Sequence, residues 1–214
     1  SLKLPLGITL MCFNLDLITL YNKVHHYVHE FFSWDREIER AMYTNNSLQA
    51  LLDQANIHMK TSMAILNAGY RVLAFSRNEE IVEPILDPMC ESGMMNYEMV
   101  KTITLNLADQ GMDLSSQDEV EYLAPHSGYY SFIWNITYND KIVGRFTMIL
   151  KQTEPSPFYR DFGRVIREHI TEFFTSDHAV HFSQNEMIGN LVTDIIEGRI
   201  TSETVLNERL KPLE

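Results

Sequence analysis

The sequence predicts an α+β domain in which an antiparallel β-sheet is flanked by helices at both ends of the chain. Two segments, residues 63–75 and 129–150, place apolar residues on either side of a short turn, which is typical of β-hairpins. Apolar residues recur at helical spacing over residues 15–42 and 158–174. With 214 residues, 45% of them hydrophobic, the chain is long enough for one moderate domain with added helices, or for two small domains.

Residues 15–42 are predicted to form an amphipathic helix. Its apolar stripe consists of Leu17, Leu20, Val24, Val28 (or Tyr27), Phe31 and Ile38, at spacings of three, four or seven. The stripe either packs on the protein's own sheet or pairs with the same helix of a second subunit, and the pattern leaves both open. Asn45, Asn46 and Ser47 then predict a break with an N-cap, followed by a second helix over residues 48–59.

The first predicted hairpin joins residues 63–66 to residues 71–75. The turn lies between them, and Gly69 is expected to take the positive φ that it needs. Prolines and a glycine punctuate residues 79–93, so that a helix there is expected to be short. Residues 97–110 predict a further helix, although its first half is also compatible with a strand.

The second hairpin has the clearest pattern in the chain. Tyr130, Phe132, Trp134, Ile136 and Tyr138 are predicted to face one side of the sheet, and Ser131, Ile133, Asn135 and Thr137 the other. A type I′ turn at Asn139 and Asp140 leads to the partner strand over residues 142–150, and residues 120–123 predict a further strand. The helix over residues 158–174 is predicted to turn Phe162, Val165, Ile166, His169, Ile170 and Phe173 inward.

The order of these elements resembles that of PAS and GAF sensor domains. Residues 63–76, MAILNAGYRVLAFS, are similar to their first hairpin, and residues 129–150 with the helix from Phe158 are similar to their closing hairpin and last helix. The similarity covers roughly residues 45–175. It implies a PAS/GAF-like antiparallel sheet, with a ligand held between the sheet and the helices on its face.

Residues 185–214, NEMIGNLVTDIIEGRITSETVLNERLKPLE, predict two helices separated by a break at Gly198. Leu191, Ile195, Ile196, Gly198, Leu206, Arg209 and Leu210 resemble a segment of bacterial transcription regulators of the PucR and CdaR type. In that family a sensor domain precedes this segment, and a middle domain and a helix-turn-helix follow it. The resemblance implies that this chain is the sensory part of such a regulator.

The composition excludes several classes of function. Asp and Glu outnumber Lys and Arg by 29 to 17, and the formal net charge is −12, so we expect no direct binding of nucleic acid. Cys12 and Cys90 belong to no CxxC or Cys/His motif, which argues against a zinc site and fits a reducing cytoplasm. The apolar run over residues 4–13 is too short for a membrane span, and we expect no membrane contact.

The candidate ligand site is the sheet face that carries Tyr130, Phe132, Trp134 and Tyr138, because ligand pockets are mostly apolar with a few polar groups. Arg145, on the partner strand, is expected to meet an acidic ligand if it points inward. Tyr97 and Asn135 are expected to add hydrogen bonds. The alternative is that these aromatic residues fill the core against the last helix.

No catalytic motif is present, and the sequence predicts neither an enzyme nor a bound cofactor or metal. His25 and His29 stand one helical turn apart, as metal ligands can, but a polar flank of the helix is the simpler interpretation. The pair formed by His178 and His181 is interpreted in the same way. Two alternatives stay open: a small hydrolase or metal-dependent enzyme on the same scaffold, and a purely structural dimerisation module.

Together these patterns divide the chain into three parts. Residues 1–44 are predicted to be a helical dimerisation segment, residues 45–176 a GAF/PAS-like sensor domain, and residues 177–214 a helical linker to output domains that this sequence does not contain. The predicted function is that of a cytoplasmic, homodimeric, non-enzymatic sensor region of a bacterial transcription regulator. Its small-molecule ligand is not identified by the sequence.

Overall fold

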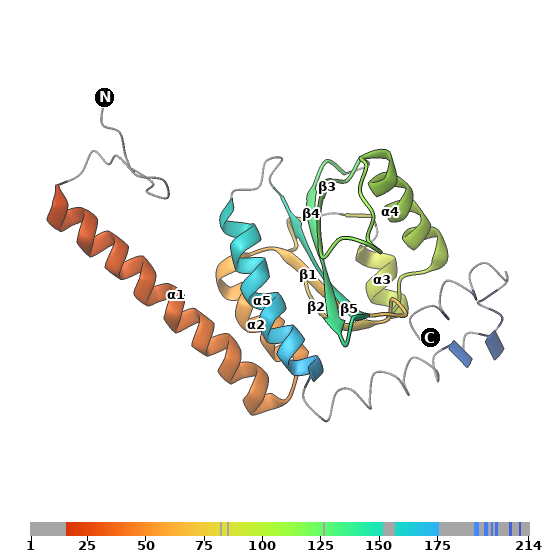
Figure 1. The fold of residues 1–214 in the computed structure, drawn as a ribbon, viewed down its shortest axis with the longest axis horizontal. Helices are drawn as coiled ribbons and strands as arrows, with labels where there is room; N and C mark the ends of the chain where they lie inside the picture. The colour runs from red at the N-terminus through yellow and green to blue at the C-terminus, as the bar shows by residue number, and fades with distance from the viewer. Residues whose placement is uncertain are drawn as a thin grey trace. The chain divides into compact units, whose positions relative to one another are not determined.

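The computed structural model describes residues 16–81, 83–84, 86–125, 127–151 and 157–175, and further residues 191–192, 195–196, 198, 200, 206 and 210 (Figure 1). The elements are α1 (Leu17–Asn45), α2 (Leu48–Met59), β1 (Ser62–Asn67), β2 (Val72–Ser76), α3 (Leu86–Ser92), α4 (Tyr97–Asp109), β3 (Glu119–Leu123), β4 (Tyr130–Tyr138), β5 (Lys141–Leu150) and α5 (Pro157–Thr175). The predicted α+β fold is confirmed. Most of the predicted linker over residues 177–214, with His178 and His181, lies outside the described residues, as does Cys12.

The five strands form one antiparallel sheet in the order β2-β1-β5-β4-β3. Both predicted hairpins are present, and the pairing of β1 with β5 joins them at the centre of the sheet. This register runs from Ser62 opposite Ile149 to Asn67 opposite Gly144. Arg145 therefore lies between two neighbouring strands, opposite Leu66 on β1 and Asn135 on β4.

Helices cover both faces of the sheet (Figure 1). α2 and α5 lie side by side on one face, where α2 packs on β1 and β2 and α5 packs on β4 and β5. α3 and α4 lie on the opposite face. The sheet thus separates two layers of side chains, and period-two alternation decides which layer each strand residue enters.

The predicted N-terminal helix is confirmed. The chain forms two compact units, residues 1–37 and 38–214, and α1 contributes residues to both. In the second unit, Ile38 and Met42 of α1 are fully buried. In the first unit, members of the predicted apolar stripe are exposed: Leu17 by 80%, Val24 by 50% and Val28 by 47%.

The turns follow the sequence pattern in one hairpin and depart from it in the other. Asn139 and Asp140 both have positive φ, 49° and 61°, which confirms the predicted two-residue turn. The expectation for Gly69 was wrong, because the positive φ of 65° falls on Tyr70. Asn67 supports this arrangement, since its side-chain oxygen accepts a hydrogen bond from the Arg71 amide at 2.9 Å.

The predicted helix cap at Ser47 is confirmed. Its hydroxyl oxygen accepts a hydrogen bond from the Ala50 amide at 3.3 Å, which satisfies one of the free donors at the start of α2. An equivalent cap begins α4, where the Asn96 side chain accepts a hydrogen bond from the Met99 amide at 3.0 Å. This cap fixes the start of α4.

The face under α5 is filled by an aromatic stack. Trp134 is fully buried, and its ring centroid lies 5.3 Å from that of Phe132 and 5.2 Å from that of Phe146. Its indole Nε1 donates to Glu119 at 3.0 Å. Gly163 of α5 lies directly on the indole, because a Cβ added there would come within 2.2 Å of the Trp134 ring.

This contact rotates α5 by about one residue from the predicted orientation. Ile166 and Ile170 are buried as predicted, but the other buried residues are Gly163 and Phe174. Phe162 and Phe173, which were predicted to face inward, are only half-buried. The physical reason is that the indole needs a residue without a side chain above it.

Replacement of Gly163 by Ala tests this contact. Gly to Ala in a helix is ordinarily stabilising, but here the methyl group meets the indole. We expect Gly163→Ala to lower the free energy of unfolding by about 2 kcal/mol, measured by urea denaturation. Gly69→Ala is the matched control, since its Cβ would meet nothing closer than 3.4 Å. A Gly163→Ala protein as stable as the wild type would show that α5 does not rest on Trp134.

Candidate ligand-binding cavity

The face of the sheet opposite α5 carries a different set of side chains. Alternation along β4 and β5 sends Phe132, Trp134 and Phe146 towards α5, and it sends Ser131, Ile133 and Arg145 towards the other face. The first set is packed solid, whereas the second lines a cavity.

This cavity lies between the sheet and helices α3 and α4 and has a volume of about 60 Å³. Its apolar lining consists of Leu66, Leu86, Met89, Met95, Val100, Ile103, Leu114, Ile133 and Ile149. Its polar lining consists of Tyr70, Glu83, Thr104, Tyr122, Ser131, Arg145 and Thr147.

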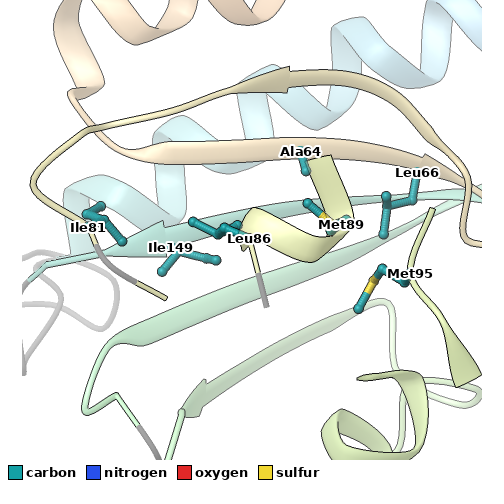
Figure 2. Packing of buried hydrophobic residues seen from close by; sticks show 7 residues of the cluster. All are labelled: Ala64, Leu66, Ile81, Leu86, Met89, Met95 and Ile149. Atoms are coloured by element: carbon teal, nitrogen blue, oxygen red, sulfur yellow. The ribbon is translucent and has the colours of Figure 1, made fainter. Parts of the chain in front are cut away.

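The apolar part of the lining comes from distant parts of the chain. Figure 2 shows Leu66 and Ile149 on the sheet, Leu86 and Met89 on α3, and Met95 in the segment between α3 and α4. Two of these residues are methionines, whose unbranched side chains adapt to differently shaped neighbours. The cavity wall on the helix side is therefore apolar and adaptable.

Arg145 supplies a positive charge to the cavity. Its guanidinium carbon lies 4.7 Å from the centre of the Tyr70 ring, which gives a cation–π contact. Its Nε and Nη1 atoms are buried and have no hydrogen-bond partner among the residues that the structure describes. Unpartnered buried donors are costly, and a guanidinium is suited to bind a carboxylate or phosphate through two parallel hydrogen bonds.

Glu83 supplies a negative charge to the same cavity. The residue is only 7% exposed, and its Oε2 atom is buried without a hydrogen-bond partner within the described part of the chain. Burial raises the pKa of the neighbouring Tyr122 to about 12, an effect that the Glu83 charge reinforces and a hydrogen bond with Ser131 opposes. The Tyr122 phenol is therefore neutral at physiological pH, and Tyr122 lines the same cavity as Glu83.

The residues that the sequence predicted for the site separate between the two faces. Arg145 lines the cavity, whereas Phe132 and Trp134 pack against α5, as the core-filling alternative describes. Tyr130 is half-buried at the start of β4, and Tyr97 begins α4 with a side chain that lies outside the described residues. Whether any of them touches a ligand stays a prediction.

Asn135 and Tyr138, two further residues of the predicted site, do not line the cavity. Asn135 donates from its side chain to the carbonyl oxygens of Leu114 and Gln117, at 2.6 and 2.8 Å. It therefore anchors the loop before β3. Tyr138 is half-buried at the far end of β4.

Sequence reasoning missed Glu83, Tyr70 and Tyr122. Tyr122 has a usable signal, because it lies opposite Ser131 in the β3–β4 register and alternation places both on one face. Glu83 has a weaker one: it lies between Val82 and Pro84 in a segment that reads as a solvated loop. Tyr70 stands in the turn of the first hairpin, where an aromatic residue carries no specific signal.

The other candidate chemistry gains no support. His25 and His29 are exposed on α1, and His26 lies 3.3 Å from Glu30 in an exposed pair. In the part of the chain that the structure describes, no three or more His, Cys, Asp and Glu side chains are grouped as metal ligands would be. None of the helices within the described residues has both the length and the apolar content that crossing a bilayer requires.

No protein-family model matches this chain, and no curated protein matches it. Among solved structures, it is similar to the cofactor-binding GAF domain of the nutrient sensor CodY from Clostridium difficile. The identity is 11% and the TM-score 0.45, over 66% of this chain and 96% of that one. The fold is an α+β fold. Helices accompany an antiparallel sheet of five strands in the part of the chain that the structure describes.

Because Oε2 of the Glu83 carboxylate has no hydrogen-bond partner among the described residues, we expect replacement of Glu83 to stabilise the protein. Replacing a buried, unsatisfied charged group by an apolar group of similar size removes its desolvation cost. We expect Glu83→Met to raise the free energy of unfolding by about 1 kcal/mol in thermal or urea denaturation. Glu79→Met is the control, because the Glu79 side chain is 87% exposed. A marked loss of stability in Glu83→Met alone would instead give the carboxylate a structural role.

Proposed function

We propose that this chain is the ligand-sensing and dimerising region of a cytoplasmic bacterial transcription regulator of the PucR or CdaR type. The observation that carries the proposal is the cavity between the sheet and helices α3 and α4. It combines an apolar lining with Arg145 and Glu83, whose buried polar atoms have no partner among the described residues. Such a site gains most when a small molecule supplies the missing partners.

The lining favours binding over catalysis. The described residues that line the cavity include no His, Cys, Lys or Asp, and the Ser131 hydroxyl is hydrogen-bonded to Tyr122 rather than to a base. Nucleophilic and general acid–base catalysis need a nucleophile and a base within hydrogen-bond reach of each other. The same set of side chains is sufficient to hold a ligand, which supports a non-enzymatic sensor.

Contacts through the sheet give the ligand a route to α5. Arg145 lies opposite Asn135, whose backbone carbonyl accepts a hydrogen bond from Arg167 Nε on α5 at 3.0 Å. Phe146, the next residue on β5, stacks on Trp134 beneath Gly163. A ligand that shifts β5 would therefore shift the balance between two arrangements of α5. Residues 177–214 would then transmit the change to output domains that carry the helix-turn-helix.

We further propose that α1 pairs with α1 of a second copy. Leu17, Leu20, Val24, Tyr27 and Phe31 follow the alternating three–four spacing of a coiled-coil seam. Tyr27 is 67% exposed, in line with the other exposed apolar residues of this segment. A repeat of this kind is complementary to itself, so the same helix of a second copy is the partner that fits.

Ligand binding can be tested with a pair of tryptophan variants on α4. Thr104 and the next residue, Leu105, are both exposed, but only Thr104 lines the cavity. A thermal-shift screen of cell metabolites should yield a compound that raises the melting temperature of the wild-type chain. Thr104→Trp should weaken binding of that compound at least about tenfold in isothermal titration, because the indole occupies the cavity mouth. Leu105→Trp should bind it as the wild type does.

The same experiment can contradict the proposal in two ways. If no compound raises the melting temperature, the chain is better described as a structural or dimerisation module. If a compound binds equally well to the wild type and Thr104→Trp, its site lies elsewhere.

Dimerisation can be tested by placing equal charge on or off the seam. Val24→Glu with Tyr27→Glu puts two carboxylates in the apolar stripe, whereas Asn22→Glu with His29→Glu puts them on the other side of the same helix. Sedimentation should show a monomer for the first pair and a dimer for the second and the wild type. A dimer in both variants would exclude α1 as the interface, and a monomeric wild type would contradict dimerisation itself.

A further inference from the structure

We infer that the cavity takes an elongated molecule with an apolar body, an anionic group at one end and a protonated amine at the other. Arg145 would bind the anionic end and Glu83 the amine. This inference rests on the proposed sensing function and names the class of ligand that the site would take.

The two charged residues belong to opposite ends of the cavity. The segment that carries Glu83 lies at the Ile149 end of β5, because Glu80 pairs with Lys151 at 2.7 Å and because Ile81 and Leu86 belong to the same buried cluster as Ile149. Ile149 is four residues from Arg145 on β5, a Cα separation of about 13 Å at the usual rise of a strand. A ligand whose amine and acid share one carbon atom is too short to reach both groups.

The direction of the Arg145 side chain widens this separation. Its guanidinium lies over Tyr70, which follows β1 at the end of the sheet where Asn67 pairs with Gly144. Ile149 pairs with Ser62 at the opposite end of that ladder. The guanidinium therefore leans away from Glu83, and no described residue forms an ion pair with either group.

The anionic end of the ligand follows from the atoms left free on Arg145. Nε and Nη1 point their hydrogen atoms into a buried space without an acceptor among the described residues. A carboxylate provides two oxygen atoms at the spacing of two guanidinium N–H groups. An alcohol or amide would satisfy only one of them and leave the charge unbalanced.

The amine end follows from the opposite deficiency at Glu83. An ionised carboxylate only accepts hydrogen bonds, and Oε2 receives none from the described residues. A protonated amine supplies both the missing donor and the balancing charge. Tyr122, which lines the same cavity, is neutral and does not repel the amine.

The space between the two ends is mostly apolar, and Thr147, between Arg145 and Ile149 on β5, adds a hydroxyl group. Leu66, Met95, Ile103 and Ile133 line it, and they offer no side-chain hydrogen-bonding group to a ligand. A chain of methylene groups gains free energy when such a lining removes it from water. The cavity thus favours ω-amino acids and related linear molecules.

The test compares probes with two charged ends and probes with one. Isothermal titration and thermal shift would use ω-amino acids of four, six and eight carbons, with monocarboxylates and alkylamines of the same lengths. We expect the best ω-amino acid to bind at least about tenfold more tightly than either single-ended probe, since a hydrogen bond to a charged group has about this effect. The full 214-residue chain is used throughout.

Variants assign each end to its residue. Glu83→Gln keeps the size of the side chain and should weaken the ω-amino acid about tenfold while leaving the monocarboxylate unchanged. Arg145→Met should weaken both, and Glu79→Gln, on an exposed carboxylate, should weaken neither. Equal binding of the monocarboxylate and the ω-amino acid, or no effect of Glu83→Gln, would show that water satisfies Oε2 and would overturn the amine end.

Failure of the inference is distinct from failure of the proposed function. If no two-ended probe binds, but a metabolite from the screen binds in a way that Thr104→Trp weakens, the ligand class is wrong and the sensing cavity stands. If neither the probes nor any metabolite binds, both are wrong.

Discussion

The burial of Trp134 beneath Gly163 determines how the rest of the structure is arranged. The indole is stacked between Phe132 and Phe146 and lies against the backbone of α5, so that little space is left on that face of the sheet. Its Nε1 donates to Glu119, which also receives Arg164 of α5 at 2.8 Å. Because a strand alternates strictly, fixing Trp134 on this face sends Ile133 to the other. The packing of one face under α5 therefore determines which residues of β4 face the cavity.

The face of the sheet that lines the cavity carries unsatisfied charged groups that lower stability, and, within the described part of the chain, the face packed under α5 does not. A buried guanidinium and a buried carboxylate, each with atoms that lack partners among the described residues, lower the stability of the folded chain. The two groups do not satisfy each other, because both keep atoms without a hydrogen-bond partner in the part of the chain that the structure describes. Proteins tolerate such groups where a bound molecule completes them, and strained or unsatisfied groups gather at functional sites. The arrangement thus supports the proposed binding of a ligand.

The helices and strands, and the two faces of the sheet, could be predicted from the sequence. What packs on each face could not. Alternation over β4 predicted two faces, and the turn at Asn139 and Asp140 was predicted from its residue types. Aromatic side chains alone do not show whether they fill a core or line a pocket, because both are apolar. The decision here rests on Gly163, which is distant in sequence from Trp134. Glu83 resembles a solvated loop residue until α3 and the sheet enclose it.

The position of β5 explains how a small ligand would act at a distance. Arg145 and Phe146 are consecutive residues that face opposite layers, so a displacement of β5 at the cavity also displaces the aromatic stack. A close-packed stack does not absorb such a shift by loosening, because lost contacts are costly. α5 is attached more weakly at its side: its ion pairs from Arg160 and Arg164 to Glu119 and Glu121 are partly exposed and rearrange at little cost. A shift of β5 is therefore expected to move α5 as a rigid body, and the chain beyond α5 would follow it.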